Sequence, residues 1–443
     1  MKHYYFIGIK GSGMASLANI LLDLGYEVSG SDIDQHIFLE DRLRARGVEI
    51  LPFSEDNLKD GMIVIKGNAF DNDFSEVKKA KEMNLEMHTY MEMLQKLINE
   101  YYSVSIAGTH GKTTTTGLVS SILSANGSTG YLIGDGHGEI TKDSENFVVE
   151  SCEYKDNFLN YTPDIALINN IELDHVDYFH SMKQYIDSFA QFASQAKKYV
   201  VLNGDDKNVL EIPKKDNYYY FGENDNNNFQ AKNVVLNQQG IKFDLYTDYK
   251  RANKEYVYTF NLNLFGHHMM SNALAAIAIY VLRTDEQDYK KMEEQLNLYK
   301  GVARRFDVIE QNTNIFVDDY AHHPTAIKLM IETVKIRYPF KRVISFFKPD
   351  RYSRIYQFGD EIAKALDLSD EAYLFEFPST SAKEEGIDIN MNYVLEKMNK
   401  GVIIDESKDS VERFKDYRNC IFLFMSSKNV YDFRDQVIAI TKH

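Results

Sequence analysis

The stretch "AGTHGKTTTTG" contains the residue types that bind the phosphates of a nucleoside triphosphate. Gly108 and Gly111 let backbone amides approach phosphate oxygens, and Lys112 supplies a charge for the β- and γ-phosphates. Thr113 supplies a hydroxyl for Mg²⁺. The stretch is a shortened phosphate loop, because the G-x-x-x-x-G-K-[ST] spacing requires a glycine where the sequence has Ile106. A chance match is the alternative, but the loop follows a strand pattern and precedes a helical one.

Acidic residues follow two later strand patterns of the same region. Glu150 ends "VVE", and Glu172, Asp174 and His175 lie in "NNIELDH". Mg²⁺ prefers hard oxygen ligands, and the carboxyl ends of parallel strands meet at one edge of a sheet. Each acid alone is more often a solvated strand end. Together with Lys112 they predict a metal and phosphate site.

A second glycine-rich loop, "GIKGSGM", follows the first strand pattern. It contains Gly8, Gly11 and Gly13, while Ser16 occupies the third glycine position of G-x-G-x-x-G. Asp32 closes the next strand, where a dinucleotide fold places its ribose-binding acid. A bound nucleotide or diphosphate and a tight turn without ligand both fit. A nicotinamide oxidoreductase is the function that this loop alone favours, but it leaves the lysine loop unexplained.

Strand, loop and helix patterns must position these residues, and such patterns restart twice after the first loop. Strand patterns lie at 4–9, 27–32, 61–67, 102–108, 147–153, 165–175, 199–206, 314–320, 342–347, 371–377 and 420–426, and helical patterns at 75–84, 113–127, 184–197, 267–282, 323–338 and 358–368. The segment between 216 and 259 is rich in β-strand residues. We therefore expect three α/β domains, at residues 1–100, 101–300 and 301–443.

Composition excludes several classes of protein. The net charge of −16, with no basic stripe, argues against nucleic-acid binding. No segment reaches the roughly 20 apolar residues of a membrane span, and the apolar run near the start is too short for a signal peptide. Cys152 and Cys420 are far apart, which supports neither a disulfide framework nor a zinc site. We expect a cytoplasmic protein without membrane insertion.

The sequence resembles the Mur ligases, the ATP-dependent enzymes that add amino acids to the cytoplasmic peptidoglycan precursor. The resemblance covers essentially the whole chain, and it lies nearest to the alanine-adding branch. The motifs that carry it are, in order, "YFIGIKGSGM", "GTHGKTT", "DHVDYF", "GVARRFD", "DDYAHHPT" and "PDRYSR". The short loop, glycine-threonine-x-glycine-lysine-threonine, is typical of this family. The absence of a lysine between Lys183 and Lys197 also agrees with that branch, which lacks the carbamylated lysine of several other Mur ligases.

The resemblance implies a Rossmann-like N-terminal domain for the UDP-sugar, a central P-loop ATPase-like domain and a Rossmann-like C-terminal domain. Residues implied to bind ATP are Gly108, Thr109, His110, Gly111, Lys112, Thr113, Thr114, Asn272, Arg305 and Asp319. Residues implied to hold Mg²⁺ are Thr113, Glu150 and His175. Residues implied to bind the other substrates are Gly11, Ser12, Gly13, Asp32, Tyr320 and His322. Residues implied to act in catalysis are Lys112, His175, Arg305, His323, Arg351 and Arg354.

The implied reaction uses ATP and Mg²⁺ to join L-alanine to UDP-N-acetylmuramate in peptidoglycan precursor synthesis. ATP phosphorylates the muramate carboxylate, and the amine of the amino acid attacks the resulting acyl phosphate. Either His322 or His323 would orient or deprotonate that amine; capping and packing of a helix start is the alternative role for this pair. The expected partners are these small molecules, and the expected state is a monomer or weak homodimer.

The sequence departs from the family pattern at three places. Asp350 and Lys348 replace a histidine and a glutamine before "RYSR", and Met269 replaces an asparagine. The pattern "MGAGD" near the C-terminus is replaced by "MSSKN", whose changed residues are 426–429. The alternatives are therefore a different amino acid or acceptor, a paralogue with weakened activity, or a nucleotide-binding protein without catalysis.

Overall fold

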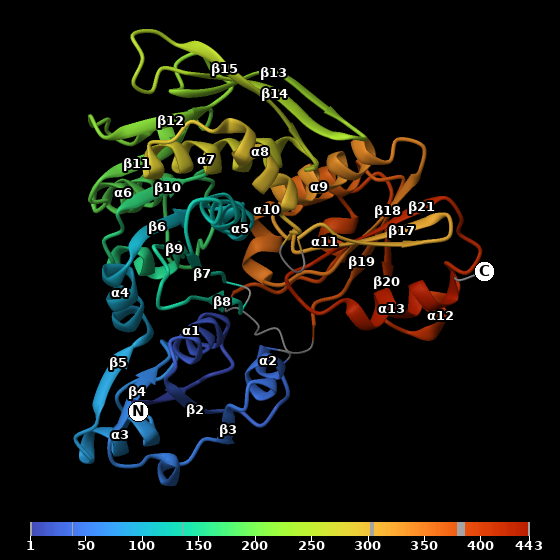
Figure 1. Ribbon diagram of the computed structural model, residues 1–443. Helices are drawn as coiled ribbons and strands as arrows, with labels where there is room; N and C mark the ends of the chain where they lie inside the picture. The colour runs from blue at the N-terminus through green and yellow to red at the C-terminus, as the bar shows by residue number, and fades with distance from the viewer. Residues whose placement is uncertain (1, 38, 135, 302–304, 379–385, 442–443) are drawn as a thin grey trace. The chain divides into compact units, whose positions relative to one another are not determined.

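The computed structural model has its strands in three sheets with helices around them (Figure 1). It describes residues 2–37, 39–134, 136–301, 305–378 and 386–441. The chain divides into two compact units. The first unit contains Met1–Ala231, Tyr246–Tyr256 and Asn272–Tyr299, and the second contains Lys232–Leu245, Val257–Ser271 and Lys300–His443. This arrangement has the α/β class that the sequence predicts.

The N-terminal sheet is parallel and has the order β3-β2-β1-β4-β5. Its strands are β1 (His3–Ile7), β2 (Glu27–Asp32), β3 (Glu49–Pro52), β4 (Met62–Lys66) and β5 (Glu86–Thr89). Its helices are α1 (Ser12–Asp23), α2 (Leu39–Ala45), α3 (Ser75–Glu82) and α4 (Tyr90–Glu100). The strand order reverses at β1, and the glycine-rich loop leaves the carboxyl end of β1, where sheets of this kind bind ligands.

The middle sheet has the order β15-β14-β13-β12-β11-β10-β6-β9-β7-β8. Its strands are β6 (Tyr102–Ala107), β7 (Thr129–Leu132), β8 (Gly138–Glu139), β9 (Asn146–Glu150), β10 (Ile165–Ile168), β11 (Tyr199–Asn203), β12 (Tyr218–Gly222), β13 (Phe229–Asn237), β14 (Gly240–Thr247) and β15 (Glu255–Leu262). The helices of this region are α5 (Lys112–Leu123), α6 (Met182–Ser194), α7 (His267–Thr284) and α8 (Tyr289–Leu298). Strand β6 lies between β9 and β10, so the loops after these three strands meet at one edge.

The C-terminal sheet has the order β16-β17-β21-β18-β19-β20, with β16 antiparallel to β17. Its strands are β16 (Asp307–Gln311), β17 (Asn314–Asp319), β18 (Arg342–Phe347), β19 (Glu371–Phe375), β20 (Val402–Ile404) and β21 (Cys420–Met425). Its helices are α9 (Pro324–Arg337), α10 (Tyr352–Leu366), α11 (Asn392–Leu395), α12 (Lys408–Glu412) and α13 (Tyr431–Ile440). Strand β21 is central although it comes last in the chain, so the fold of this domain needs its final strand.

Two sequence-predicted elements differ from the structure by more than a few residues at one end. The strand predicted for 165–175 ends at Ile168, because the backbone beyond it bonds to the lysine loop instead of a neighbouring strand. The helix predicted for 358–368 begins earlier, at Tyr352, and has non-helical angles at Phe358. The sequence "YSR" at its start lacks the apolar periodicity of a helix, so the pattern does not predict the first turn.

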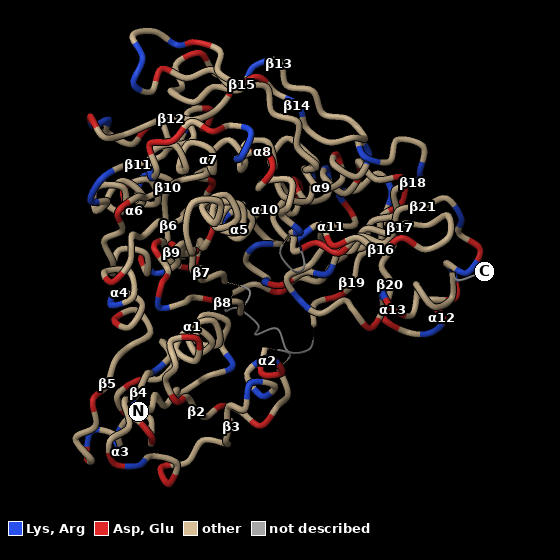
Figure 2. Tube along the Cα trace, in the orientation of Figure 1, with Lys and Arg blue, Asp and Glu red and all other residues tan. Residues whose placement is uncertain are grey.

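Charge and helix composition can be followed along the trace. Acidic residues outnumber basic ones, 66 to 50, and the two kinds are interspersed along the chain (Figure 2).

Within the described ranges, none of the helices combines the length and apolar character needed to span a bilayer.

A buried glutamate joins the elements of the N-terminal domain. The side chain of Glu76 on α3 is fully buried, so its carboxylate depends on hydrogen bonds from protein groups. Four groups donate to it: Tyr5 OH at 2.8 Å, Ser31 Oγ at 2.6 Å, Ser54 N at 3.1 Å and Asn57 Nδ2 at 3.3 Å. These donors come from β1, β2 and the segment after β3, so one side chain fixes α3 against the sheet.

We predict that Glu76→Ala lowers the free energy of unfolding of the N-terminal domain by about 3 kcal/mol or more, because several buried donors lose their acceptor. Glu82→Ala is the matched control, since Glu82 is exposed on the same helix. Denaturant unfolding followed by tyrosine fluorescence measures both variants. Equal stability of the two variants would contradict this role of Glu76.

Candidate active site

The lysine loop needs glycine at two positions. Gly108 has φ of 143° and Gly111 has φ of 79°, both in the region that favours glycine. A Cβ at Gly108 would lie 3.0 Å from Cβ of Asn169, and one at Gly111 would lie 3.2 Å from Oδ1 of Asn272. Helix α5 begins directly after this loop, so its first-turn amides offer hydrogen-bond donors suited to an anion.

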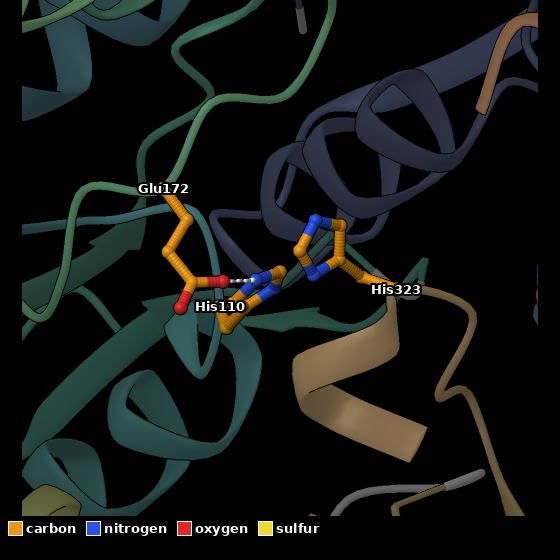
Figure 3. Close-up of side chains that lie close together, drawn as sticks. All are labelled: His110, Glu172 and His323. Carbon is orange, nitrogen blue, oxygen red and sulfur yellow. Dashed lines mark hydrogen bonds and ion pairs between the residues drawn. The ribbon is translucent and has the colours of Figure 1, made fainter. Parts of the chain in front are cut away.

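The loop after β10 holds the lysine loop in place. Asn170 accepts a hydrogen bond from Thr109 N at 3.1 Å through its carbonyl and from His110 N at 2.8 Å through Oδ1. Thr109 Oγ1 donates to the carbonyl of Glu172 at 2.9 Å. The Glu172 carboxylate lies 3.0 Å from His110 Nε2 (Figure 3). The acid that the sequence offers as a metal candidate therefore contacts His110.

Lys112 forms a buried ion pair with Glu153. Its Nζ lies 2.8 Å from Glu153 Oε2 and also donates to the carbonyl of Gly108 at 2.5 Å. The side chains of Lys112 and Glu153 are 14% and 1% exposed. Two charges that are buried from water must be paired, because an unpaired buried charge is strongly unfavourable.

The pKa shifts follow from this pairing. Burial alone would lower the pKa of Lys112, but Glu153, with Cys152 and Glu150 nearby, raises that pKa. Burial alone would raise the pKa of Glu153, but Lys112 and then His175 lower it. Both groups are therefore charged at neutral pH.

His175 lies on the other side of Glu153. Its Nε2 is 3.5 Å from Glu153 Oε1, and Tyr185 OH donates to the same oxygen at 3.4 Å. The backbone of His175 has φ of 52°, the left-handed conformation that redirects the chain after β10. Its Nδ1 is buried and has no hydrogen-bond partner in the part of the chain that the structure describes. An imidazole nitrogen is a donor that could fit a metal ion.

Thr113 and Glu150 carry hard oxygen atoms of the kind that Mg²⁺ prefers. Thr113 Oγ1 donates to Glu150 Oε2 at 3.0 Å, and Gly134 N donates to the same oxygen at 2.8 Å. A hydroxyl and a carboxylate are the donor types that Mg²⁺ takes from proteins beside a phosphate. The donor set thus fits a magnesium ion at the start of α5.

Two further sequence-predicted ATP residues lie near this loop. Thr114 lies in the first turn of α5. Asn272 is buried on α7, and its amide is next to Gly111. The structure therefore brings Asn272 to the lysine loop although 161 positions separate Asn272 from Gly111 in the sequence.

The N-terminal glycine loop leads into α1. Gly11 is the N-cap, and Ser12 and Gly13 begin the helix without a side-chain cap. A Cβ at Gly13 would lie 3.0 Å from the Tyr90 ring. The Asp32 carboxylate accepts from Lys10 N at 2.7 Å and from Ile33 N at 2.8 Å, so it already fixes the loop backbone.

In the second unit, Asp319 ends β17 and organises the segments around it. Its carboxylate accepts hydrogen bonds from Phe306 N at 2.9 Å and Ala321 N at 2.8 Å. The Arg305 guanidinium lies 4.7 Å from the centre of the Tyr320 ring. Residues 302–304, part of the motif "GVARRFD", lie outside the described residues.

The histidine pair and the arginines also belong to the second unit. His322 Nδ1 lies 2.7 Å from the carbonyl of Tyr320, and His323 is the buried N-cap residue of α9. Arg351 is the N-cap residue of α10, and Arg354, one turn later, pairs with Asp350.

Sequence reasoning missed Glu153 and Tyr185. Glu153 stands three positions after Glu150 in "ESCE", so a search for a counter-ion of Lys112 could have found it. Tyr185 carries no sequence signal, since its contact with Glu153 depends on how α6 packs. It is fully buried.

Family models match three consecutive parts of the chain. The model described as Mur ligase family, catalytic domain, matches residues 3–102. The Mur ligase middle domain matches 106–280, and the Mur ligase, glutamate ligase domain, matches 304–427. The chain belongs to the Mur ligase family. Members of this family are ATP-dependent amide ligases, and the predicted three-domain α/β fold is confirmed.

Solved Mur ligases have the same fold. A UDP-N-acetylmuramate-alanine ligase from Thermotoga maritima is 23% identical, with a TM-score of 0.80 over 99% of this chain and 99% of that chain. A murein peptide ligase from Psychrobacter arcticus is 21% identical, with a TM-score of 0.71 over 100% of this chain and 99% of that chain. A pseudomurein peptide ligase type C from Methanothermus fervidus is 23% identical, with a TM-score of 0.69 over 99% of this chain and 100% of that chain.

We predict that Glu153→Gln destabilises this Mur ligase by about 3 kcal/mol at neutral pH, because Lys112 loses its buried counter-ion. The lowered pKa of Glu153 means that its contribution is complete above the ordinary value of 4.5 and is lost as the pH falls through the folded-state value. The difference between wild type and variant should therefore shrink on acidification.

Thermal melts between pH 4 and pH 8 measure this difference, with exposed Glu211→Gln as the matched control. A difference that is absent at neutral pH, or that grows on acidification, would contradict the charged pair.

Proposed function

We propose that this Mur ligase joins L-alanine to UDP-N-acetylmuramate, with ATP and Mg²⁺, through an acyl phosphate. The observation that carries the proposal is the grouping of Lys112, Thr113, Glu150 and His175 around one loop, in a chain whose other domains also match the family. The order of motifs, nearest to the alanine-adding branch, supports the choice of substrates.

The reaction has two steps. ATP would supply the phosphoryl group, and a bound Mg²⁺ would contribute positive charge that stabilises it. A muramate carboxylate oxygen bonds to the γ-phosphorus as the bond to ADP breaks. The amine nitrogen then bonds to the carbonyl carbon and loses a proton, and phosphate leaves.

The residues of the chain position these groups. Lys112 would offer its charge to the β- and γ-phosphates, and Thr113, Glu150 and His175 would hold the metal ions. Glu153 keeps Lys112 charged and directed at the loop. This is catalysis by positioning and electrostatic stabilisation, as expected for phosphoryl transfer.

Other roles follow the family motifs. We assign residues 108–114, Asn272, Arg305 and Asp319 to ATP. We assign Gly11, Ser12, Gly13 and Asp32 to the UDP-sugar, and Tyr320 and His322 to the amino-acid end. His323, Arg351 and Arg354 complete the catalytic set, and domain boundaries near residues 100 and 300 separate these tasks.

We also propose that the enzyme works in the cytoplasm, as a monomer or weak homodimer, in the synthesis of the peptidoglycan precursor. The two cysteines support a reducing compartment, because Cys152 and Cys420 are both free thiols.

A nucleotide-binding protein without ligase activity is the second candidate. The observation that favours it is the change of family residues at Lys348, Asp350 and 426–429. It would bind ATP without amine-dependent turnover.

We predict phosphate release from ATP that requires Mg²⁺, UDP-N-acetylmuramate and an amino acid together, in a screen of L-alanine, glycine and L-serine. Lys112→Ala should lower kcat by about 10²–10³-fold or more, because a charge that stabilises the transferring phosphoryl group is lost. Exposed Lys290→Ala is the matched control. ATP binding without phosphate release in every combination would favour the second candidate instead.

A further inference from the structure

The ammonium group of Lys112 turns back onto the loop that carries it. Its Nζ donates to the carbonyl of Gly108 at 2.5 Å and to the carbonyl of Thr109 at 3.3 Å. The same nitrogen lies 2.8 Å from Oε2 and 3.1 Å from Oε1 of Glu153. An ammonium group has three hydrogen atoms to donate, so two carbonyls and one carboxylate use all of them.

A bound phosphate would need the same hydrogen atoms. The lysine of a phosphate loop acts as a point charge that contacts the β- and γ-phosphates. Lys112 can make such a contact only after at least one of its present hydrogen bonds breaks. We expect the bond to Glu153 to break, because a carboxylate beside the ammonium repels an incoming anion, whereas the two loop carbonyls carry no net charge.

Glu153 has further contacts that would remain after Lys112 leaves it. Tyr185 OH donates to Glu153 Oε1 at 3.4 Å, and His175 Nε2 lies 3.5 Å from the same oxygen. Tyr185 is itself fully buried on α6, where its ring packs edge-on against the ring of Phe189. The carboxylate therefore keeps partners in its buried position when the ion pair opens.

The two members of the ion pair differ in their freedom to move. The side chain of Glu153 is 1% exposed, whereas that of Lys112 is 14% exposed and reaches solvent. A lysine carries its charge on a flexible four-carbon stem, so its ammonium can swing without any movement of the helix backbone. We therefore expect the ammonium to move toward a nucleotide while the carboxylate stays in place.

We propose that Glu153 competes with the phosphates of ATP for Lys112 and thereby sets the affinity of this enzyme for the nucleotide. This inference rests on the proposed binding of ATP at the lysine loop. The ion pair is the resting state of that loop, and bound phosphates replace Glu153 as the counter-ion of Lys112. Glu153 is thus a positioning residue, because it acts on the nucleotide through Lys112.

The test measures the dissociation constant of ADP, with Mg²⁺, by titration calorimetry on the full chain. Glu153→Gln should bind ADP about tenfold more tightly than wild type, because no ionic hydrogen bond must be broken first. Glu153→Asp keeps the charge but withdraws it by one methylene group, so its affinity should lie between those of wild type and Glu153→Gln. Exposed Glu211→Gln is the matched control and should leave the affinity unchanged.

A double variant shows whether the effect passes through Lys112. In the Lys112→Ala background, Glu153→Gln should change the affinity for ADP much less than it does in wild type, because there is no ammonium group to compete for. A carboxylate that only supports the fold of the loop would instead weaken ADP binding when it is removed, in both backgrounds.

The outcomes separate this inference from the proposed function. Weaker or unchanged ADP binding by Glu153→Gln and Glu153→Asp, relative to wild type, would overturn the inference. If thermal melts show that Glu153→Gln does not fold, the sign of the change in Glu153→Asp decides. Neither the muramate nor an amino acid enters this measurement, so a failed ligase assay leaves it intact. A wild type that does not bind ADP would overturn both the inference and the proposed ATP site.

Discussion

The buried pair of Lys112 and Glu153 is the constraint on which the first unit of this Mur ligase depends. Lys112 begins α5, Glu153 follows β9, and the same carboxylate contacts His175 on the loop after β10. Neither charge is stable in this buried position without the other. The segments that carry Lys112, Glu153 and His175 must therefore come together. Their meeting fixes the lysine loop beside the oxygen atoms of Thr113 and Glu150. The sheet order and the glycine geometry of the loop thus support one arrangement of charged and oxygen-bearing side chains.

The sequence predicts the α/β class and the order of the long elements, because buried strands and glycine-ended helices leave clear periodic signals. It does not predict where β10 stops, since "IALINNI" is apolar beyond Ile168 while the backbone there bonds to Thr109 and its neighbours. The lysine loop is predictable from local spacing. The role of Glu153 is not predictable in this way, because it depends on a contact with Lys112, which lies 41 positions earlier in the sequence.

The second unit shows a different relation to the family pattern. The lysine loop of the first unit matches the family pattern, whereas Lys348 and Asp350 replace neutral or weakly basic residues beside an altered segment. Both new charges have partners, Glu406 for Lys348 and Arg354 for Asp350. Paired charges of this kind avoid the free-energy cost of a buried charge without a partner.

The most direct test of the ligase mechanism traces an oxygen atom from the muramate carboxylate to the released phosphate. UDP-N-acetylmuramate with ¹⁸O in both carboxylate oxygens is incubated with the enzyme, ATP, Mg²⁺ and L-alanine or L-serine, and the released phosphate is analysed by mass spectrometry. An acyl phosphate predicts that each phosphate carries one ¹⁸O from the muramate. Phosphate without the label would mean that water attacks ATP, and it would contradict the ligase mechanism.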